Sequence, residues 1–271
     1  MIETKTEEEW ERIADPVKYR SPSQWNQYDR CPYSYYLSRR ERVWEKPAAW
    51  LGHGTAVHRA VELWEQSGRV MTPEEAVEAF KESYRAEINV VLKQSPNPKS
   101  WFASGPYGGI KDIPRRYEVG QEHVLNVLRY YREHPDEKPW VDPNGKMWVE
   151  KEFKVKFGDV EVVGFIDVVI DEKPRDYKTG TTPGYVEQLA TYGGVLLLEW
   201  DIPFTTGDFF MAKRGTPTRP YDLSDWSIER LADTYGELDE NIKAERFDPK
   251  PDIDVCPRCP VASSCEFKYV E

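Results

Sequence analysis

Cysteine is scarce in this 271-residue chain, which contains four in all. Three of them form a CxxCxxxxxC run at Cys256, Cys259 and Cys265, and the fourth, Cys31, lies 225 positions upstream. The chain also lacks a long apolar run, since the longest, Gly193–Leu198, is far shorter than the roughly 18 residues that a membrane-spanning helix needs. We therefore expect no membrane partner for this protein.

The sequence has little that resembles a secretory signal, because its first nine residues are acidic and polar. We expect a cytoplasmic, reducing location, in which structural disulfides are rare and clustered cysteines bind metal. A GxxxxGK[ST] phosphate-binding loop is missing as well, which excludes a helicase motor of that type. We find no internal repeat and no low-complexity tract.

Basic charge is outweighed by acidic charge, with 37 Lys and Arg against 48 Asp and Glu and a net charge of −11. This balance argues against a broad electrostatic clamp on duplex DNA, although it permits a local basic channel. The densest basic clusters fit either such a channel or a solvated surface: Arg39, Arg40 and Arg42; Lys111, Arg115 and Arg116; Lys213, Arg214 and Arg219.

The composition supports a globular protein, because 39% of the residues are hydrophobic and the chain holds 10 Trp, 16 Tyr and 10 Phe. We expect an N-terminal arm over residues 1–20 and a single domain over 21–271. Within that domain we distinguish a helical part (21–135), an α/β core (146–250) and a cysteine-rich tail (251–271).

Helical signals dominate the first half of the chain. Ser21-Pro22-Ser23-Gln24 and Thr72-Pro73-Glu74-Glu75 are capping boxes, each with proline in the first helical turn. Apolar spacing predicts further helices over 51–66 and 116–133 and extends the helix after Thr72 to residue 92. The Pro- and Gly-rich segment 94–115 predicts a long loop or small insertion.

Strand signals follow. Residues 147–157 and 160–170 alternate between apolar and polar side chains around the two-residue turn Gly158-Asp159. A short strand holding residues 176–178, a helix over 183–200, a strand over 208–213 and a helix over 224–246 complete the pattern. The order predicts an α/β fold with a central mixed sheet and the helical part folded against it.

The triplet Asp176-Tyr177-Lys178 carries the first chemical signal. Side chains alternate along a strand, so Asp176 and Lys178 project from one face and Tyr177 from the other. Asp167 lies on the preceding strand, and the turn at 171–174 brings the two strands together. Carboxylates bind Mg²⁺, and a histidine such as His58 also suits Mn²⁺. The alternative is an ordinary strand end with a salt bridge.

Two more residues share a helix face downstream, because Gln188 and Tyr192 are spaced i, i+4. Alone they fit a solvent-facing glutamine beside a core tyrosine. Four segments stand in a characteristic order and approximate spacing: Gly54-Thr55-Ala56-Val57-His58, Gly164…Asp167, Asp176-Tyr177-Lys178 and Gln188-x-x-x-Tyr192. Together they resemble the RecB-like nucleases of the PD-(D/E)XK superfamily.

The resemblance implies a restriction-endonuclease-like fold and a role for each matched residue. His58, Asp167, Asp176 and the Tyr177 backbone carbonyl are expected to bind Mg²⁺ or Mn²⁺, and Lys178 is expected to be catalytic. Gln188 and Tyr192 are expected to touch substrate. The family often adds a glutamate on the first strand, for which Glu150 and Glu152, on one face, are both candidates. We prefer His58 to His53 as the ligand, and expect no catalytic role for His123 or His134.

The four cysteines form the second constellation. Their spacing fits a zinc site or a 4Fe–4S cluster, whereas four unrelated buried thiols are the plainer alternative. The resemblance favours the cluster, because RecB-like nucleases that contain one place one cysteine before the histidine helix and three after the sheet. It implies that Cys31, Cys256, Cys259 and Cys265 clasp the two ends of the chain. It extends from about Ser21 to Cys265, with no motif in residues 94–147.

An aromatic segment surrounds Cys31, with Trp25, Tyr28, Tyr33, Tyr35 and Tyr36 close together. These rings suit stacking on DNA bases, but we favour packing around the cluster. The resemblance as a whole implies a metal-dependent exonuclease that cleaves single-stranded DNA or DNA ends. Such proteins occur in bacteria and phages, in recombination, repair or CRISPR-type adaptation, with helicase, recombinase or integrase partners. The alternative function is a non-catalytic DNA-end-binding or adaptor subunit.

Overall fold

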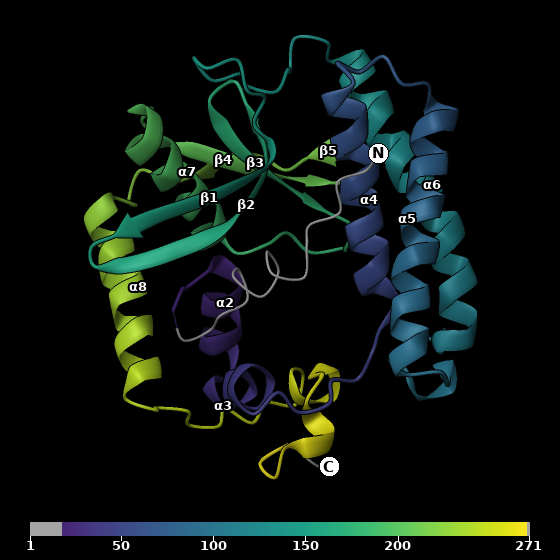
Figure 1. Cartoon of the computed structure of the whole chain (residues 1–271), viewed down its shortest axis with the longest axis vertical. Coiled ribbons are helices and arrows are strands. Elements are labelled where there is room, and N and C mark those ends of the chain that lie inside the picture. Colours follow the sequence, from purple (N-terminus) through teal and green to yellow (C-terminus); the bar gives the residue numbers. More distant parts are fainter. Residues whose placement is uncertain (1–17, 270–271) are drawn as a thin grey trace.

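The computed structural model describes residues 18–269, in which a mixed sheet lies between two groups of helices (Figure 1). The α-helices are α2 (Pro22–Arg30), α3 (Pro32–Tyr35), α4 (Ala49–Gln66), α5 (Pro73–Gln94), α6 (Gly109–Glu133), α7 (Val186–Trp200) and α8 (Ile228–Lys243). A π-helical turn, η1 (Tyr36–Arg40), and the short 3₁₀ turns η2 (Pro98–Ser100), η3 (Cys256–Arg258) and η4 (Ala262–Ser264) complete the helical elements. The strands are β1 (Val149–Phe157), β2 (Val160–Ile170), β3 (Lys173–Lys178), β4 (Thr206–Met211), β5 (Thr216–Pro217) and β6 (Tyr221–Asp222).

The sheet has the strand order β1-β2-β3-β4-β5, with β6 paired to β4. Strands β1, β2 and β3 form an antiparallel meander, and β3 and β4 run parallel. Parallel neighbours need a crossover, which α7 supplies. The predicted turn at Gly158-Asp159 is confirmed, and Gly158 has the positive φ of 59° that a tight hairpin requires. The predicted α/β architecture with a mixed central sheet is therefore confirmed.

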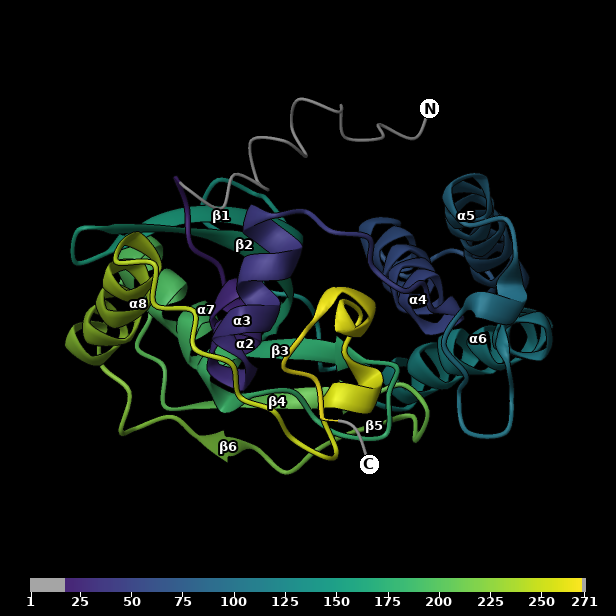
Figure 2. The ribbon, with the colours of Figure 1, turned by 90° about the horizontal axis from the view of Figure 1, so that it is seen from below.

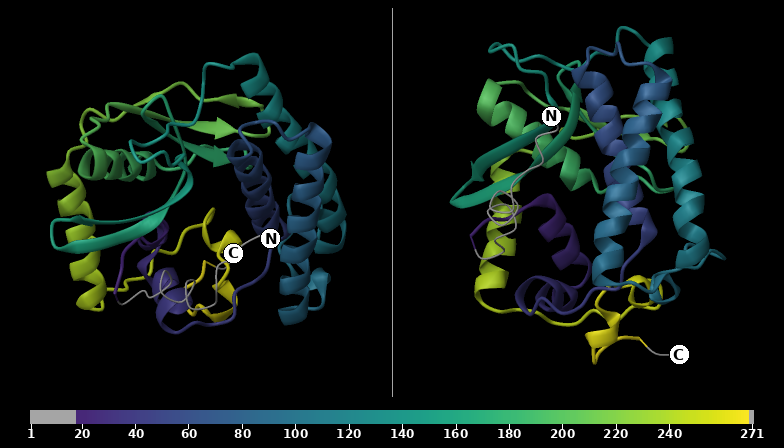
Figure 3. Two further views of the ribbon diagram at one scale, coloured as in Figure 1. Left: turned by 45° about the horizontal axis from the view of Figure 1, so that its top comes forward. Right: turned by 45° about the vertical axis from the view of Figure 1, so that its right-hand side comes forward.

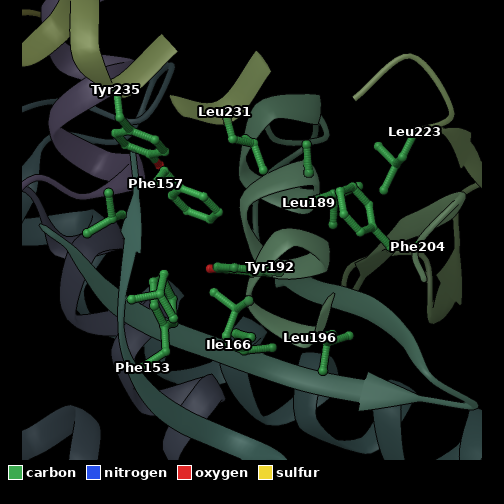
Figure 4. Close-up of a cluster of buried hydrophobic side chains, with 14 of the residues drawn as sticks. Phe153, Phe157, Ile166, Leu189, Tyr192, Leu196, Phe204, Leu223, Leu231 and Tyr235 are labelled. Carbon is green, nitrogen blue, oxygen red and sulfur yellow. The ribbon is translucent and has the colours of Figure 1, made fainter. Parts of the chain in front are cut away.

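Two hydrophobic cores lie on opposite faces of the sheet. The first packs β1 and β2 against α7 and α8, with Tyr192 and Phe157 among its members (Figure 4). The second packs the other face against α4, α5 and α6, which stand side by side as a bundle (Figure 3). Along β4, Phe209 and Met211 join the first core while Phe210 joins the second. This period-two pattern is that of a strand buried on both faces.

The loop predicted over 94–115 is wrong for its last third, because α6 begins at Gly109 and runs through Pro114. Proline inside a helix is unfavourable, since it removes one backbone N–H donor. Packing outweighs that loss: Asp112 is fully buried on α6, and the Tyr84 hydroxyl donates to the Ile113 carbonyl at 3.0 Å. Trp101, in the shortened loop, is buried and donates to the Ser95 carbonyl at 3.0 Å.

The predicted N-terminal arm falls mostly outside the described residues, but its last two residues are packed against the sheet. Tyr19 and Arg20 are buried, and the Arg20 guanidinium pairs with Asp239 on α8 at 2.7 Å. The Arg20 backbone N–H also donates to the Glu161 carbonyl of β2 at 2.9 Å. None of the helices in residues 18–269 combines the length and apolarity needed to cross a membrane.

Candidate active site and thiol cavity

Three carboxylates lie in a row across three adjacent strands. The pairs Val149↔Val168 and Lys151↔Ile166 flank Glu150 and Asp167, which therefore stand opposite each other on β1 and β2. The pairing of Val168 with Arg175, continued by one step, sets Asp167 beside Asp176 on β3. Directly opposed residues on one sheet face are close neighbours. Strand register thus sets the three acids side by side, and the backbone at Glu150 decides where that carboxylate points.

Glu150, rather than Glu152, belongs to this group. Its backbone has φ 46°, a left-handed conformation that is strained in a non-glycine residue. The alternation of side chains along β1 changes phase there. Before Glu150 the odd-numbered Val149 packs in the second core and Trp148 in the first, whereas after it the odd-numbered Phe153 packs in the first. The expectation that Glu150 and Glu152 share a face is therefore wrong, because the distortion turns Glu150 into the site and leaves Glu152 exposed.

His58 enters this row from α4, the bundle helix that lies nearest the sheet (Figure 2). Its Nδ1 lies 3.0 Å from Glu150 Oε1 and 3.6 Å from Asp167 Oδ2, and its Nε2 lies 3.0 Å from the Tyr177 carbonyl. Both hydrogen-bond partners are acceptors, so without a cation both ring nitrogens donate and the imidazole is charged. A cation binds Nδ1 only when that nitrogen has lost its proton, because a ligating histidine is neutral. The helix thus presents His58 to the acids and to the backbone of β3 at once.

The charges in the site shift each other's pKa. Burial by itself would lower the pKa of His58, but the negative charges of Asp167 and Glu150 outweigh it and raise the pKa to about 10. Burial, reinforced by Asp167, raises the pKa of Asp176 to about 7. Burial and the charge of Glu150 likewise raise the pKa of Asp167 to about 6. Burial and mutual repulsion therefore both disfavour the fully ionised form of the acid row.

This donor set fits a hard divalent cation. One ligand atom each from His58, Glu150 and Asp167 lies within 4.8 Å of the others. Carboxylate oxygens with one imidazole are the donors that Mg²⁺ and Mn²⁺ accept. The carboxylate of Asp176 lies outside this closest set, since it contacts Lys178 Nζ at 2.6 Å. The Tyr177 carbonyl borders the site through His58.

Lys178 lies on the same face as Asp176 and reaches α7, where its Nζ donates to Gln188 Oε1 at 3.1 Å. Gln188 Nε2 then donates to the Tyr192 hydroxyl at 2.7 Å. The tyrosine ring itself is 3% exposed and packs in the first core. This burial makes Tyr192 a support for Gln188, and the expected contact with substrate stays a prediction that concerns its hydroxyl alone.

A network that the sequence did not reveal supports β3 from the opposite face. The Tyr177 hydroxyl lies 2.8 Å from the Tyr131 hydroxyl on α6. Arg175 donates to Tyr131 at 3.2 Å and forms a bidentate pair with Asp208 at 2.6 and 2.9 Å. Asp208 lies on β4, beside Arg175 in the parallel register. Strand alternation signalled that Arg175 faces away from Asp176, but no sequence pattern identified its partners.

The remaining histidines lie away from the acids. His53 Nε2 lies 3.1 Å from His123 Nδ1, and both side chains are buried between α4 and α6. Burial lowers the pKa of His53 to about 3 and that of His123 to about 4, so both rings are neutral at pH 7. His134 is exposed at the end of α6. The geometry therefore places His58 alone, of the four histidines, beside the acids.

All four cysteines line one cavity of about 170 Å³ between α2–α3 and the C-terminal turns. Burial raises the pKa of Cys265, and the other three thiols add to that rise. No three of these sulfur atoms lie within 4.8 Å of one another in the described chain. A zinc tetrahedron with Zn–S bonds of about 2.3 Å has edges of about 3.8 Å, so the thiols are spread more widely than zinc requires.

The tail reaches this cavity by packing on the aromatic segment near the N-terminus (Figure 2). Tyr35 stacks on Phe247 with ring centroids 6.1 Å apart, and Tyr33 meets Phe267 at 4.9 Å. The Lys46 backbone N–H donates to the Pro260 carbonyl at 2.8 Å. These tyrosines therefore pack on rings that follow α8, Phe247 and Phe267, which confirms the packing part of our interpretation.

Three arginines from two of the predicted basic clusters contact neighbouring side chains. Arg115 and Arg116 lie 2.6 and 3.4 Å from the carboxylate of buried Asp112. Arg39 donates to Gln27 at 2.6 Å. These three cations therefore stabilise the helical part, whichever surface the rest of each cluster forms.

Comparison with known proteins agrees with this geometry. The chain is 40% identical over 258 residues to the Gene 69 protein of Mycobacterium phage D29, covering 91% of this chain and 96% of the relative. It is 38% identical over 276 residues to the Gene 69 protein of Mycobacterium phage L5, covering 91% and 95%. The family model of the PD-(D/E)XK nuclease superfamily matches residues 19–266. Because that match spans the acids, the lysine and all four cysteines, the chain belongs to the PD-(D/E)XK nuclease superfamily, whose members are metal-dependent nucleases.

Proposed function

We propose that this protein is a RecB-like exonuclease that hydrolyses single-stranded DNA or DNA ends with Mg²⁺ or Mn²⁺. The observation that carries the proposal is the row Glu150–Asp167–Asp176 across three paired strands, with Lys178 in contact with its last member. In this row Glu150, Asp167 and His58 are the closest donors to the cation, with Asp176 and the Tyr177 carbonyl at its border. When bound, the cation activates water and neutralises charge that develops on the phosphate.

Lys178 supplies the positive charge of the protein itself. Its Nζ contacts Asp176 at 2.6 Å and Gln188 at 3.1 Å, so it is fixed between β3 and α7. Burial lowers the pKa of Lys178, but the charges of Asp176 and Asp167 outweigh burial and raise it, so the ammonium form persists at pH 7. A fixed ammonium orients the attacking water and stabilises the charge of the transition state. Gln188, held by Tyr192, keeps it in place.

We also propose that Cys31, Cys256, Cys259 and Cys265 bind a 4Fe–4S cluster. The cavity that all four cysteines line supports a shared ligand, and the resemblance to RecB-like nucleases favours iron–sulfur over zinc. The cluster joins α2–α3 to the tail and takes no part in hydrolysis. The role in recombination, repair or CRISPR-type adaptation, and a helicase, recombinase or integrase partner, follow from the RecB-like assignment and belong to the same proposal.

The test uses single-stranded DNA labelled at either end, incubated with cluster-loaded protein and Mg²⁺ or Mn²⁺. Wild type is expected to shorten the DNA only when the cation is present, and the label gives the polarity. Lys178→Met is expected to abolish shortening. Lys154→Met is the matched control, because Lys154 pairs with Glu161 on the exposed side of β1, away from the acids.

No cleavage by folded, cluster-loaded wild type contradicts the nuclease proposal and favours the DNA-end-binding subunit instead. Equal cleavage by wild type and Lys178→Met contradicts the assigned role of the lysine. Release of internal fragments, with no shortening from an end, contradicts the exonuclease assignment alone.

A further inference from the structure

The segment between β3 and α7 borders the acid row and carries a half-exposed aromatic ring. It runs from Thr179 to Tyr185, directly after Lys178. A Cβ atom at Gly184 would lie 2.7 Å from Lys178 Cε, so this end of the segment touches the lysine side chain. A Cβ atom at Gly54, one turn before His58 on α4, would lie 3.6 Å from Thr179 Oγ1. The segment therefore lies along the edge of the site.

Tyr185 is anchored at the end of this segment while its ring stays accessible. It is the N-cap residue of α7, and its carbonyl accepts the Gln188 backbone N–H at 3.0 Å. The residue is 45% exposed, in contrast to the other large aromatics next to the site, Tyr177 and Tyr192, at 2% and 3%. Its backbone is thus fixed by the helix that positions Gln188, and the residue stays accessible to solvent, one position after the glycine that touches Lys178.

Trp25 on α2 holds the Tyr185 ring. The two ring centroids are 6.4 Å apart with an interplanar angle of 81°, an edge-to-face contact. Such a contact covers one face of one ring. The Trp25 indole in turn packs against the first core. The ring of Tyr185 is therefore oriented without being enclosed, which is the arrangement of a stacking surface rather than of core packing.

We propose that Tyr185, held by Trp25, is a stacking platform for one unpaired nucleobase next to the scissile phosphate. This inference rests on the proposed function, because it assumes that a phosphodiester lies at the acid row. Every nucleobase has a π-face, so stacking on an aromatic side chain tolerates any sequence. A base inside a duplex is already stacked on both sides and reaches Tyr185 only after its pair opens. The platform therefore selects single-stranded ends.

The test measures binding without cleavage. A short single-stranded DNA with 2-aminopurine at its terminal base is mixed with the Lys178→Met protein. We expect the fluorescence to be quenched by stacking, and to recover when Tyr185→Leu is added to that background. We expect Tyr185→Leu to weaken binding about 5- to 150-fold by fluorescence anisotropy, the range that corresponds to stacking of one base. Tyr185→Phe keeps the ring and is expected to behave as the parent.

Tyr107→Leu is the matched control, because Tyr107 is 41% exposed but packs over Arg115 in the helical part. In the active protein, Tyr185→Leu is expected to raise KM for single-stranded DNA with little change in kcat. Quenching that survives in Tyr185→Leu overturns the platform. A loss in Tyr185→Phe as large as in Tyr185→Leu also overturns it, because the hydroxyl and not the ring would then bind.

The two proposals fail separately. Cleavage by wild type that does not depend on Tyr185 leaves the nuclease standing and removes the platform. Quenching that depends on Tyr185, in a protein whose wild type cleaves no DNA, supports the platform and removes the nuclease.

Discussion

The acid row and the thiol cavity are built in opposite ways. The acids and His58 lie on regular elements, β1, β2, β3 and α4, and Asp167 and Asp176 are buried. The cysteines lie at a helix break and beside short 3₁₀ turns, and each is half-buried. The first site is a consequence of strand pairing, which persists whether or not a cation is bound. The second joins segments from the two ends of the chain, so the cluster that we propose there would contribute to folding itself.

The largest effect expected from this difference is the destabilisation of a cysteine variant. Cys256→Ala removes one link between segments 225 positions apart. Closing a loop of that length contributes at most about 5 kcal/mol in the chain-entropy model. We therefore expect a large fall in the midpoint of urea unfolding, together with loss of iron and of visible absorbance. Ser263→Ala, in the same tail, is the control, and full iron content in Cys256→Ala would contradict the cluster.

An acid variant is expected to behave in the opposite way. Asp167→Asn removes one of three crowded carboxylates, which relieves repulsion, so stability is unchanged or raised in metal-free protein. The rate of DNA cleavage is expected to fall at least about 100-fold, because a cation ligand is lost. Asp159→Asn, in the exposed hairpin turn, is the control for both measurements. A clear loss of stability in Asp167→Asn would show that the acid row, too, holds the fold together.

The neutral His53–His123 pair extends the comparison to a site without carboxylates. Both histidines have a folded pKa below the unfolded value of about 6.5, so the unfolded state binds more protons as the pH falls. Stability from this pair is therefore present above about pH 6.5 and is lost between that pH and about 4. Relative to pH 7, we expect a loss of about 2 kcal/mol for each histidine at pH 5.

Urea unfolding at the two pH values checks this prediction. The double variant His53→Asn/His123→Asn is expected to have a flatter pH dependence than wild type. His134→Asn, at the exposed end of α6, should leave the dependence as it is. An equally steep dependence in the double variant would assign the effect to other groups.

The smallest effect is expected on the face of the sheet opposite the acids. Tyr177→Phe removes one hydrogen bond to Tyr131, which contributes about 1 kcal/mol to stability. Arg175 still donates to Tyr131, so β3 keeps its support. The cleavage rate should therefore change less than about threefold, which corresponds to less free energy than the lost hydrogen bond contributes. Thermal unfolding and single-turnover cleavage measure the two effects. A fall in rate of tenfold or more would mean that this network positions the acid row directly.

Much of this molecule follows from local sequence. The capping residues at Ser21 and Thr72 and the hairpin turn at Gly158 are short-range signals, and all three appear in the structure. The period of two along β3 put Asp176 and Lys178 on one face, and their contact at 2.6 Å bears this out. Such features depend on the chain within a few residues, where sterics and hydrogen bonding allow few choices.

Tertiary structure decided the rest. The sequence left Glu150 and Glu152 equal, and the left-handed backbone at Glu150, imposed where β1 meets β2, separated them. The Tyr192 ring packs against Phe153 and its hydroxyl accepts from Gln188, a supporting role that the i, i+4 spacing did not indicate. The start of α6 at Gly109 and the Arg175–Asp208 pair depend on helices and strands distant in sequence. Local periodicity predicts which residues share a face where a strand is regular. Only packing decides where a strand is distorted and which residues reach the site, because that depends on neighbours the local pattern does not contain.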